Sequence, residues 1–459
     1  QRFLLLTEHP CPDCMPDQFS FDEAIQRGEI PAGWYAASYA IGKNTFRRLT
    51  ASDPARSGET VRYAYVMLLE TEDWFQGQTY VDIMHPSAVR RFINLTHEAY
   101  LKEAGSSFGN TVTAIFTDEP RMETRTRLHP KHLKSADDRG DVILPWSEPL
   151  RNRLLKDYQT DLLDIAPLLL WDLPGSFHAR YIFRNAAGEQ FVTAFMDQIA
   201  AWCNQHHLFL TGHVLSEDTL YAQATALGDC MRCYRGMDIP GIDILCDDRQ
   251  FLTVKQAASV AHQMGREGVA SELYGVTEWN CTFKTFKLQG DWQAALGVTA
   301  RVPHLAWMSM EGEAKRDWPG SIFFQSPCWT EYSSIEDYFA RLNTVLTRGY
   351  PMIDVAVLHP VESMWLHLGT VEKNLRACQE LDDRFKILIQ SLLLNLIDFD
   401  LLSESLLPSL KPFCDEEGLH IGAMNYRTIV IPDLDTIRSS TLNLLEAFHR
   451  QGGLVICAG

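Results

Sequence analysis

Short apolar runs alternate with longer amphipathic segments along most of the chain. The short runs are rich in β-branched residues and end at turn-forming or acidic residues, a pattern typical of buried strands. Strands are predicted at residues 61–69, 113–117, 208–213, 242–245, 268–275, 302–308, 354–358, 428–431 and 454–457. Residues 1 to about 60 are rich in Pro, Asp and Gly, and we expect them to be irregular.

The amphipathic segments predict helices because their apolar residues recur three or four positions apart. In the segment 190–206, Phe191, Phe195, Ile199 and Trp202 form one stripe. The other helices are predicted at residues 87–103, 254–266, 335–348, 382–399 and 441–450, and glycine follows the first and third of these.

Strands that alternate with helices predict an α/β protein with a parallel sheet. Before residue 350 we find five or six strands rather than the eight of a (β/α)8 TIM-type barrel. We therefore expect residues 1–350 to form such a barrel without its first strands. The pattern restarts after Pro351, so residues 351–459 are expected to form a second, doubly wound α/β domain, truncated at its C-terminus. Residue 1 is Gln, and we expect the chain to be an internal piece of a longer protein.

Composition narrows the classes of partner. The 459 residues are 46% hydrophobic and carry a net charge of -18. Nucleic acid and anionic membranes attract basic surfaces, so we expect neither of them as a partner. No run approaches the roughly 18 apolar residues that cross a bilayer. The 11 cysteines are odd in number and stand mostly among apolar residues. This usage predicts a reduced, cytoplasmic protein, although a preceding segment could carry a secretion signal.

Two cysteine pairs have Cys-x-x-Cys spacing, Cys11 with Cys14 and Cys230 with Cys233. Four thiolates can hold a structural zinc ion, so a zinc-dependent enzyme is one hypothesis. It requires the two pairs to meet in the fold. Such spacings also arise by chance in a chain with many cysteines, which is the simpler interpretation.

Acidic residues recur at the ends of three predicted strands. Glu119 follows the run at 113–117 within Asp-Glu-Pro, Glu217 follows the run at 208–213, and Glu272 lies near the end of a third run. In an α/β barrel, the carboxyl ends of the strands form the active site. Hydrolysis of a glycosidic bond needs one acid and one carboxylate that acts as nucleophile or activates water. A surface position is the simpler interpretation for one glutamate, but three at equivalent places favour a shared site.

Other side chains fit a carbohydrate site. His213 and His304 stand at equivalent strand ends. Indole rings pack against sugar rings, and Trp279 and Trp318 are platform candidates because polar residues surround them. Lys315 belongs to a charged cluster beside Trp318, for which a solvated loop is the alternative.

Several aspartates could bind a hard cation such as calcium, which prefers carboxylate oxygens. The candidates are Asp118, Asp243, Asp247 and Asp248. Acids are common in loops, so the solvated interpretation is favoured for any one of them. No residue pattern predicts an organic cofactor.

These motifs, taken in order, resemble bacterial glycoside hydrolases of the family 106 α-L-rhamnosidase-like group. The resemblance runs from about residue 80 to the C-terminus. The matching blocks are Phe-Thr-Asp-Glu-Pro at 116–120, Thr-Gly-His at 211–213 with Glu217, Pro-Gly-Ile-Asp at 240–243, Ser-Glu-Leu-Tyr-Gly at 271–275, His304, Lys-Arg-Asp-Trp-Pro at 315–319 and Asp-Tyr-Phe-Ala-Arg-Leu at 337–342.

The resemblance implies a catalytic (β/α)8 barrel followed by a flavodoxin-like domain, for which a glutamine-amidotransferase-like unit is the alternative. It also implies inverting hydrolysis of a terminal sugar, such as α-L-rhamnose, with calcium near the sugar hydroxyls. Carried over to this chain, Glu119 is expected to be the acid, Glu272 the base, and Glu217 a ligand or alternative acid. Asp118, His213, Trp279, His304, Lys315 and Trp318 are expected to bind the sugar.

Two alternatives stay open. One is a retaining β-galactosidase-like enzyme on the same architecture, and the other is a non-catalytic carbohydrate-binding protein. The oligomeric state is open as well.

Overall fold

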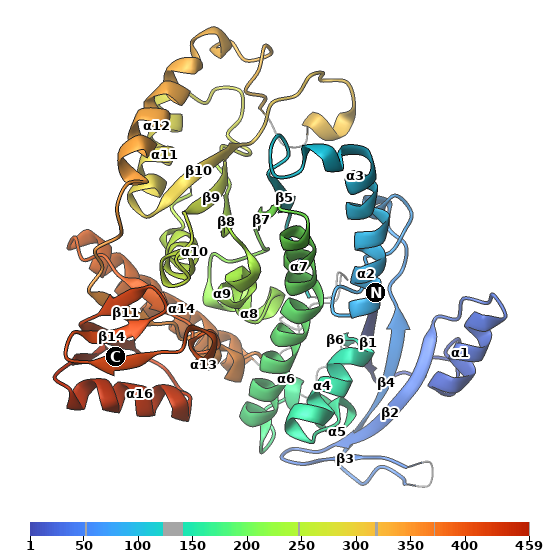
Figure 1. Ribbon diagram of the computed structural model, residues 1–459. Helices are drawn as coiled ribbons and strands as arrows, with labels where there is room; N and C mark the ends of the chain where they lie inside the picture. Colours follow the sequence, from blue (N-terminus) through green and yellow to red (C-terminus); the bar gives the residue numbers. More distant parts are fainter. Residues whose placement is uncertain (51–52, 123–140, 247, 317–319, 371, 459) are drawn as a thin grey trace.

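The computed structural model describes residues 1–50, 53–122, 141–246, 248–316, 320–370 and 372–458. The structure has three parts: an antiparallel sheet with its helices, an arc of parallel strands, and a second parallel sheet (Figure 1). No helix in these ranges is long and apolar enough to span a bilayer.

The N-terminal part is a five-stranded sheet, so the expectation of irregular structure before residue 60 is wrong. Its strands are β1 (Arg2–Thr7), β2 (Gly33–Ile41), β3 (Phe46–Arg48), β4 (Thr60–Leu68) and β6 (Val142–Trp146), in the order β3-β2-β4-β1-β6. All neighbours are antiparallel. The Pro, Asp and Gly residues lie mainly in the connections and obscured the strands between them. A short helix, α1 (Gln18–Gln26), joins the first two strands.

Helices cover the region between this sheet and the arc. They are α2 (Pro86–Leu95), α3 (His97–Ala104), α4 (Glu148–Tyr158), α5 (Leu162–Leu170), α6 (Ser176–Phe191) and α7 (Asp197–Gln205), with a π-helical turn at Val192–Met196 between the last two. The predicted helix at 87–103 is divided at Thr96, and the helix predicted from 190 begins at Ser176. Short 3-10 turns occur at Asp73–Phe75, Gly105–Ser107, Tyr234–Gly236, Glu313–Arg316 and Trp329–Glu331.

The arc contains five parallel strands, which confirms the α/β prediction. They are β5 (Ala114–Thr117), β7 (Phe209–Gly212), β8 (Gly241–Ile244), β9 (Val269–Leu273) and β10 (Val298–Pro303). Hydrogen bonds pair β5 with β7, and β9 with both β8 and β10. The described ranges contain no complete eight-stranded barrel of this kind. The strand predicted at 302–308 is also wrong, because β10 lies earlier and residues 304–308 follow its end.

A close backbone approach joins the two groups of strands in the arc. The Asp238 amide donates to the Leu210 carbonyl at 2.9 Å. A Cβ placed on Gly241 would lie 2.1 Å from the Gly212 oxygen. Only a glycine can therefore start β8 this close to β7. Helices α8 (Leu220–Ala226), α9 (Cys230–Cys233), α10 (Phe251–Gln263), α11 (Phe283–Ala295) and α12 (Ser333–Leu346) complete this part.

The second sheet has four parallel strands, β11 (Val355–Leu358), β12 (Asp400–Leu402), β16 (Thr428–Pro432) and β17 (Leu454–Ala458). Their order is β12-β11-β16-β17, the order in which a flavodoxin-like sheet begins. The flavodoxin-like and glutamine-amidotransferase-like assignments, and the division at residue 350, stay predictions. Helices α13 (Val361–Leu366), α14 (Glu372–Leu394), α15 (Leu407–Leu410) and α16 (Ser439–Arg450) accompany an antiparallel meander of β13 (Phe413–Asp415), β14 (Gly418–Ile421) and β15 (Met424–Tyr426).

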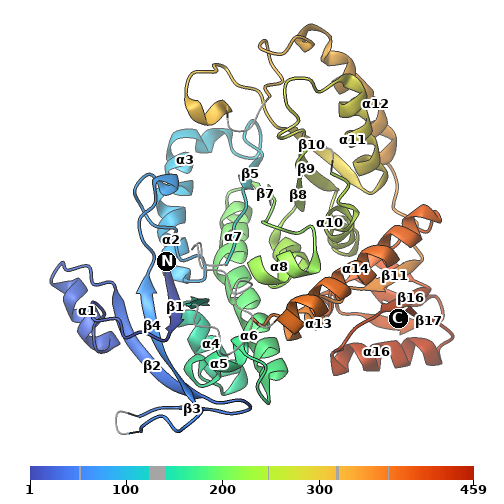
Figure 2. The same cartoon turned by 180° about the vertical axis from the view of Figure 1, so that it is seen from behind.

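The second sheet and its helices pack firmly against the first two parts. The buried Trp365 indole on α13 donates to the Gly228 carbonyl at 2.7 Å. The buried Asp229 carboxylate accepts hydrogen bonds from Ser403 and Ser405, each at 2.7 Å. One hydrophobic core runs through both regions. Helix α14 lies beside α8 and α10 (Figure 2), so the second parallel sheet and its helices border the loops at the carboxyl ends of the arc.

Candidate functional site

Acidic and imidazole side chains gather at the carboxyl ends of the arc. Asp118 and Glu119 follow β5, His213 follows β7, and Glu272 lies in β9. Two further members come from the remaining strands, Asp243 in β8 and His304 after β10. Parallel strands end at one edge, which explains how positions far apart in the sequence meet.

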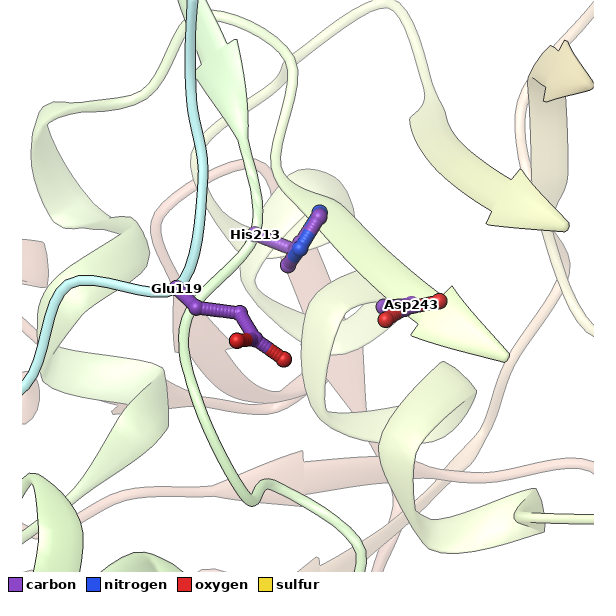
Figure 3. A group of neighbouring side chains, drawn as sticks. All are labelled: Glu119, His213 and Asp243. Carbon is purple, nitrogen blue, oxygen red and sulfur yellow. The ribbon is translucent and has the colours of Figure 1, made fainter. Parts of the chain in front are cut away.

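The centre of the site is formed by Glu119, His213 and Asp243, whose side chains converge from three strands (Figure 3). One carboxylate oxygen or ring nitrogen from each lies within 4.8 Å of the others. Glu119 adopts a left-handed backbone conformation with a φ of 43° directly after β5. The His213 amide donates to the Thr117 carbonyl at 3.0 Å, which fixes the start of the β7 loop beside the end of β5.

His213 is held as a cation by its neighbours. Its side chain is 1% exposed, with Nε2 lying 3.2 Å from Asp118 Oδ1 and Nδ1 lying 3.7 Å from Glu272 Oε2. Burial alone would lower the pKa of His213. The Asp118 hydrogen bond and the charges of Asp243, Glu217 and Glu272 outweigh burial and raise that pKa to about 9. The same hydrogen bond lowers the pKa of Asp118.

The inner carboxylates hold their protons more tightly than exposed ones. Burial, followed by repulsion from Glu272 and Glu119, raises the pKa of Asp243 to about 6, although His213 opposes the shift. Burial is also the main cause of the raised pKa of Glu272. His304 Nε2 lies 3.9 Å from Glu272 Oε1, and burial lowers the pKa of this second imidazole. The site thus pairs a charged imidazole with carboxyl groups whose pKa values are raised above their ordinary range.

Glu217 lies beneath this cluster rather than in the open site. Its side chain is buried, the residue is 4% exposed, and Oε1 has no hydrogen-bond partner. Burial raises the pKa of Glu217 to about 8 despite the nearby His213. The buried Tyr234 hydroxyl is also unpartnered, and burial followed by the charge of Glu217 raises its pKa. The role of Glu217 as a ligand or alternative acid stays a prediction.

The described hydrogen bonds and ion pairs of Trp279 and Lys315 do not connect them to the carboxylate cluster. Trp279 stands in the loop after β9, is 42% exposed and lies beside Gly320. The Lys315 ammonium donates to the Ser309 carbonyl at 2.9 Å. Trp318 and Asp247 lie outside the described residues. The substrate-binding roles assigned to these residues stay predictions.

The sequence indicates Asp243 only as a cation ligand, whereas the structure places it at the centre of the acidic cluster. The available signal was its position in the Pro-Gly-Ile-Asp block, where it alternates with apolar residues in a short strand. Asp243 lies near the carboxyl end of its strand, as Glu272 does in β9.

The central group tests the expectation of calcium. Calcium prefers six to eight oxygen ligands, whereas this group offers two carboxylates and an imidazole. An imidazole nitrogen is a typical ligand of zinc, copper or iron, and a pKa of about 9 keeps His213 protonated at neutral pH. The group therefore does not fit calcium.

The four-thiolate zinc hypothesis is not supported by the described residues. The Cys11 and Cys14 sulfurs lie 3.0 Å apart beside β4, and Cys230 and Cys233 are buried in α9. The group of potential metal ligands that the described part of the chain assembles contains no cysteine. All 11 cysteines are free thiols.

Comparisons with known proteins find structural likeness without sequence relatives. No family model and no curated protein matches the chain. A rhamnosidase from Novosphingobium sp. PP1Y superposes with a TM-score of 0.62 at 17% identity, over 92% of this chain and 40% of that one. The cold-adapted β-galactosidase from Rahnella sp. R3 superposes with a TM-score of 0.50 at 13% identity, over 97% of this chain and 60% of that one. The likeness shows a shared fold, and this chain spans less than two thirds of either protein.

Proposed function

We propose that the protein is a glycoside hydrolase that cleaves a terminal sugar from a glycan or glycoside. The observation that carries the proposal is the group of carboxylates that converge with two imidazoles on one edge of the parallel arc. Two structures with this fold are a rhamnosidase and a β-galactosidase, which supports a sugar as the substrate. We propose α-L-rhamnose as the terminal sugar, and a β-galactoside is the second candidate.

In the proposed reaction, Glu119 protonates the leaving oxygen and Glu272 takes a proton from the attacking water. A raised pKa makes the Glu272 carboxylate a stronger base, and general bases work best with a pKa near the operating pH. The His213 imidazolium lies 3.7 Å from Glu272 and keeps positive charge beside it. This charge favours the ionised form that a base requires, against the effect of burial.

Inversion and retention differ in the space between the two carboxyl groups. A separation of roughly 6.5–9.5 Å admits a water for inversion, whereas about 5–5.5 Å allows direct attack on the sugar. We propose inversion, with Glu119 and Glu272 on opposite sides of the bond. The alternative is retention, in which Glu272 attacks the sugar directly. NMR of the first anomer released distinguishes the two.

Substrates whose leaving groups differ in acidity distinguish the roles of the two glutamates. The variant Glu119→Gln should lose about 100-fold or more in rate on a substrate with a poor leaving group, because general acid catalysis contributes factors of this size. It should retain most of its rate on a dinitrophenyl glycoside, whose leaving oxygen needs no proton. Glu272→Gln should be slow on both substrates. The opposite pattern would exchange the two roles.

A non-catalytic sugar-binding protein is the alternative from another class. That protein would bind the same sugars, and neither the parent nor the two variants would release product. We also propose a cytoplasmic, bacterial location, which rests on the resemblance and on the 11 free cysteines.

A further inference from the structure

A cavity of about 570 Å³ lies between α14 and the loops that lead from β7 to α8 and from β8 to α10. Figure 2 shows α14 passing beside these two helices. The cavity thus lies at the carboxyl-end side of the arc, where the loops carry the site residues. None of the site residues described above lines it, which makes it a separate feature of that face.

The cavity has an apolar floor and a polar rim. Buried Ile389 and half-buried Tyr221 and Phe251 contribute apolar and aromatic surface. Within the described residues, the exposed Arg249 guanidinium and Lys386 ammonium have neither a hydrogen-bond nor an ion-pair partner, so both are available to a ligand. Binding sites for small molecules combine these two kinds of surface.

The charge of the rim restricts the class of ligand. Four aspartates face two cations, and the charged lining residues are Asp218, Asp248, Asp382, Asp383, Arg249 and Lys386. The excess of acid disfavours an anionic glycan. Neutral hydroxyl groups, which both donate and accept hydrogen bonds, suit a rim of carboxylates, amides and cations.

The cavity is connected to the carboxylate and imidazole cluster by short segments of chain. Asp218 is five positions after His213, and Asp248 is five positions after Asp243. Five residues span at most about 18 Å even when fully extended. A substrate of a few sugar rings can therefore reach from the carboxylate cluster to the cavity.

Helix α14 also holds one of these loops in place. The Asp382 carboxylate accepts hydrogen bonds from the amides of Leu220 at 2.7 Å and Tyr221 at 3.3 Å. It thereby caps the first turn of α8, directly after Asp218 and Thr219. These hydrogen bonds hold α14, which forms one wall of the cavity, against the loop after His213, which forms another. The cavity is therefore a fixed feature of the fold.

We propose that this cavity binds the part of a neutral oligosaccharide substrate that lies beyond the bond to be cleaved. The inference rests on the proposed function, because that function supplies the terminal sugar at the carboxylate cluster. It adds that the helices of the second sheet contribute to substrate choice, through Lys386 and its neighbours on α14.

Two substrates with the same terminal sugar test this role, an aryl monoglycoside and a neutral trisaccharide. The variants are Arg249→Ala, Lys386→Ala and Gln379→Trp, the last of which places an indole at the cavity wall. Lys373→Ala, on the exposed surface of α14 and outside the cavity lining, is the matched control. We expect KM for the trisaccharide to rise about tenfold in the three cavity variants, which corresponds to roughly 1.4 kcal/mol each. KM for the monoglycoside should change less than twofold.

Binding measured by calorimetry separates this inference from the proposed function. If the protein cleaves neither substrate but binds the trisaccharide, and the cavity variants weaken that binding, the function is wrong and the cavity assignment stands. If the protein is active and the cavity variants match the control on both substrates, the cavity assignment is overturned. Absence of both cleavage and binding overturns both.

Discussion

The buried carboxyl group of Glu217 should cost stability near neutral pH, and the substitution Glu217→Gln should remove that cost. In the unfolded chain the group has the ordinary pKa of 4.5, whereas burial raises the folded pKa to about 8. Between these values unfolding releases a proton, so the protein becomes less stable as pH rises. The destabilisation is absent below about pH 4.5 and complete above about pH 8.

The size of the effect follows from these two pKa values. Each pKa unit corresponds to about 1.4 kcal/mol, so the cost at pH 7 is about 3 kcal/mol and approaches about 5 kcal/mol above pH 8. Glutamine has the same shape and no charge. It should raise the free energy of unfolding by about 2–3 kcal/mol at pH 7 and by almost nothing at pH 4, where the glutamate is already neutral.

Urea denaturation of both proteins at pH 4, 7 and 8.5 measures this difference. Glu103→Gln is the control, since the Glu103 side chain is 77% exposed and surface substitutions change stability by about 0.5 kcal/mol at most. A constant difference between the Glu217→Gln variant and the parent at all three pH values would refute the reasoning. The reasoning would also be refuted if the stability gained by the Glu217→Gln variant over the parent were smaller at pH 8.5 than at pH 4.

Three further predictions test the site and its scaffold. Asp118→Asn should lower the pKa of His213 from about 9, as seen in an NMR titration of its ring, and an unchanged value would contradict the assigned pair. Because the Asp118 side chain is 74% exposed, the stability lost should be about 1 kcal/mol or less; the loss should be present below about pH 6.5 and disappear as pH rises through about 9. Gly241→Ala should destabilise the protein by about 1–3 kcal/mol in urea, since its Cβ would lie 2.1 Å from the Gly212 oxygen, and a stable variant would show that β7 and β8 lie further apart. Activity should survive treatment with a calcium chelator, because the central group contains an imidazole; loss of activity that added calcium restores would show that a calcium site exists.

The strand-end acids could be predicted because their signal is local. An apolar run followed by an acid marks a strand and its end, and parallel topology brings such ends together. This signal identifies Glu119 and Glu272, and the structure places both at one edge together with His213. The alternation of strands and helices likewise predicted the parallel arc and the second parallel sheet.

Of the N-terminal sheet, the strand predicted at 61–69 is present as β4, whereas the other strands could not be predicted because their signal is distributed. Strand β2 is buried over most of its length and contains an irregularity between Tyr35 and Ala37, so it lacks a clean alternation of polar and apolar residues. Strand β6 joins this sheet from beyond residue 140, a partner that no local pattern identifies. The sheet is stabilised by pairing between distant segments, which composition does not reveal.

Long-range packing also decides which acids are buried. Glu217 and Glu272 look alike in the sequence, since each lies at or near the end of an apolar run. In the fold, the Gln256 side chain of α10 donates to the Glu217 carbonyl at 2.8 Å, and Glu217 lies within the core. Glu272 stays at the edge of the site, beside His213 and His304. The local sequence around each glutamate does not contain this distinction.

The most direct test of the central claim is an NMR time course of a panel of aryl glycosides incubated with the parent protein and with Glu272→Gln. The account predicts that the parent releases sugar from at least one glycoside. It also predicts that the variant, with unchanged unfolding by urea, is slower by about 100-fold or more on that substrate. Release of sugar at the same rate by both proteins would contradict the assignment of Glu272 and, with it, the proposed active site.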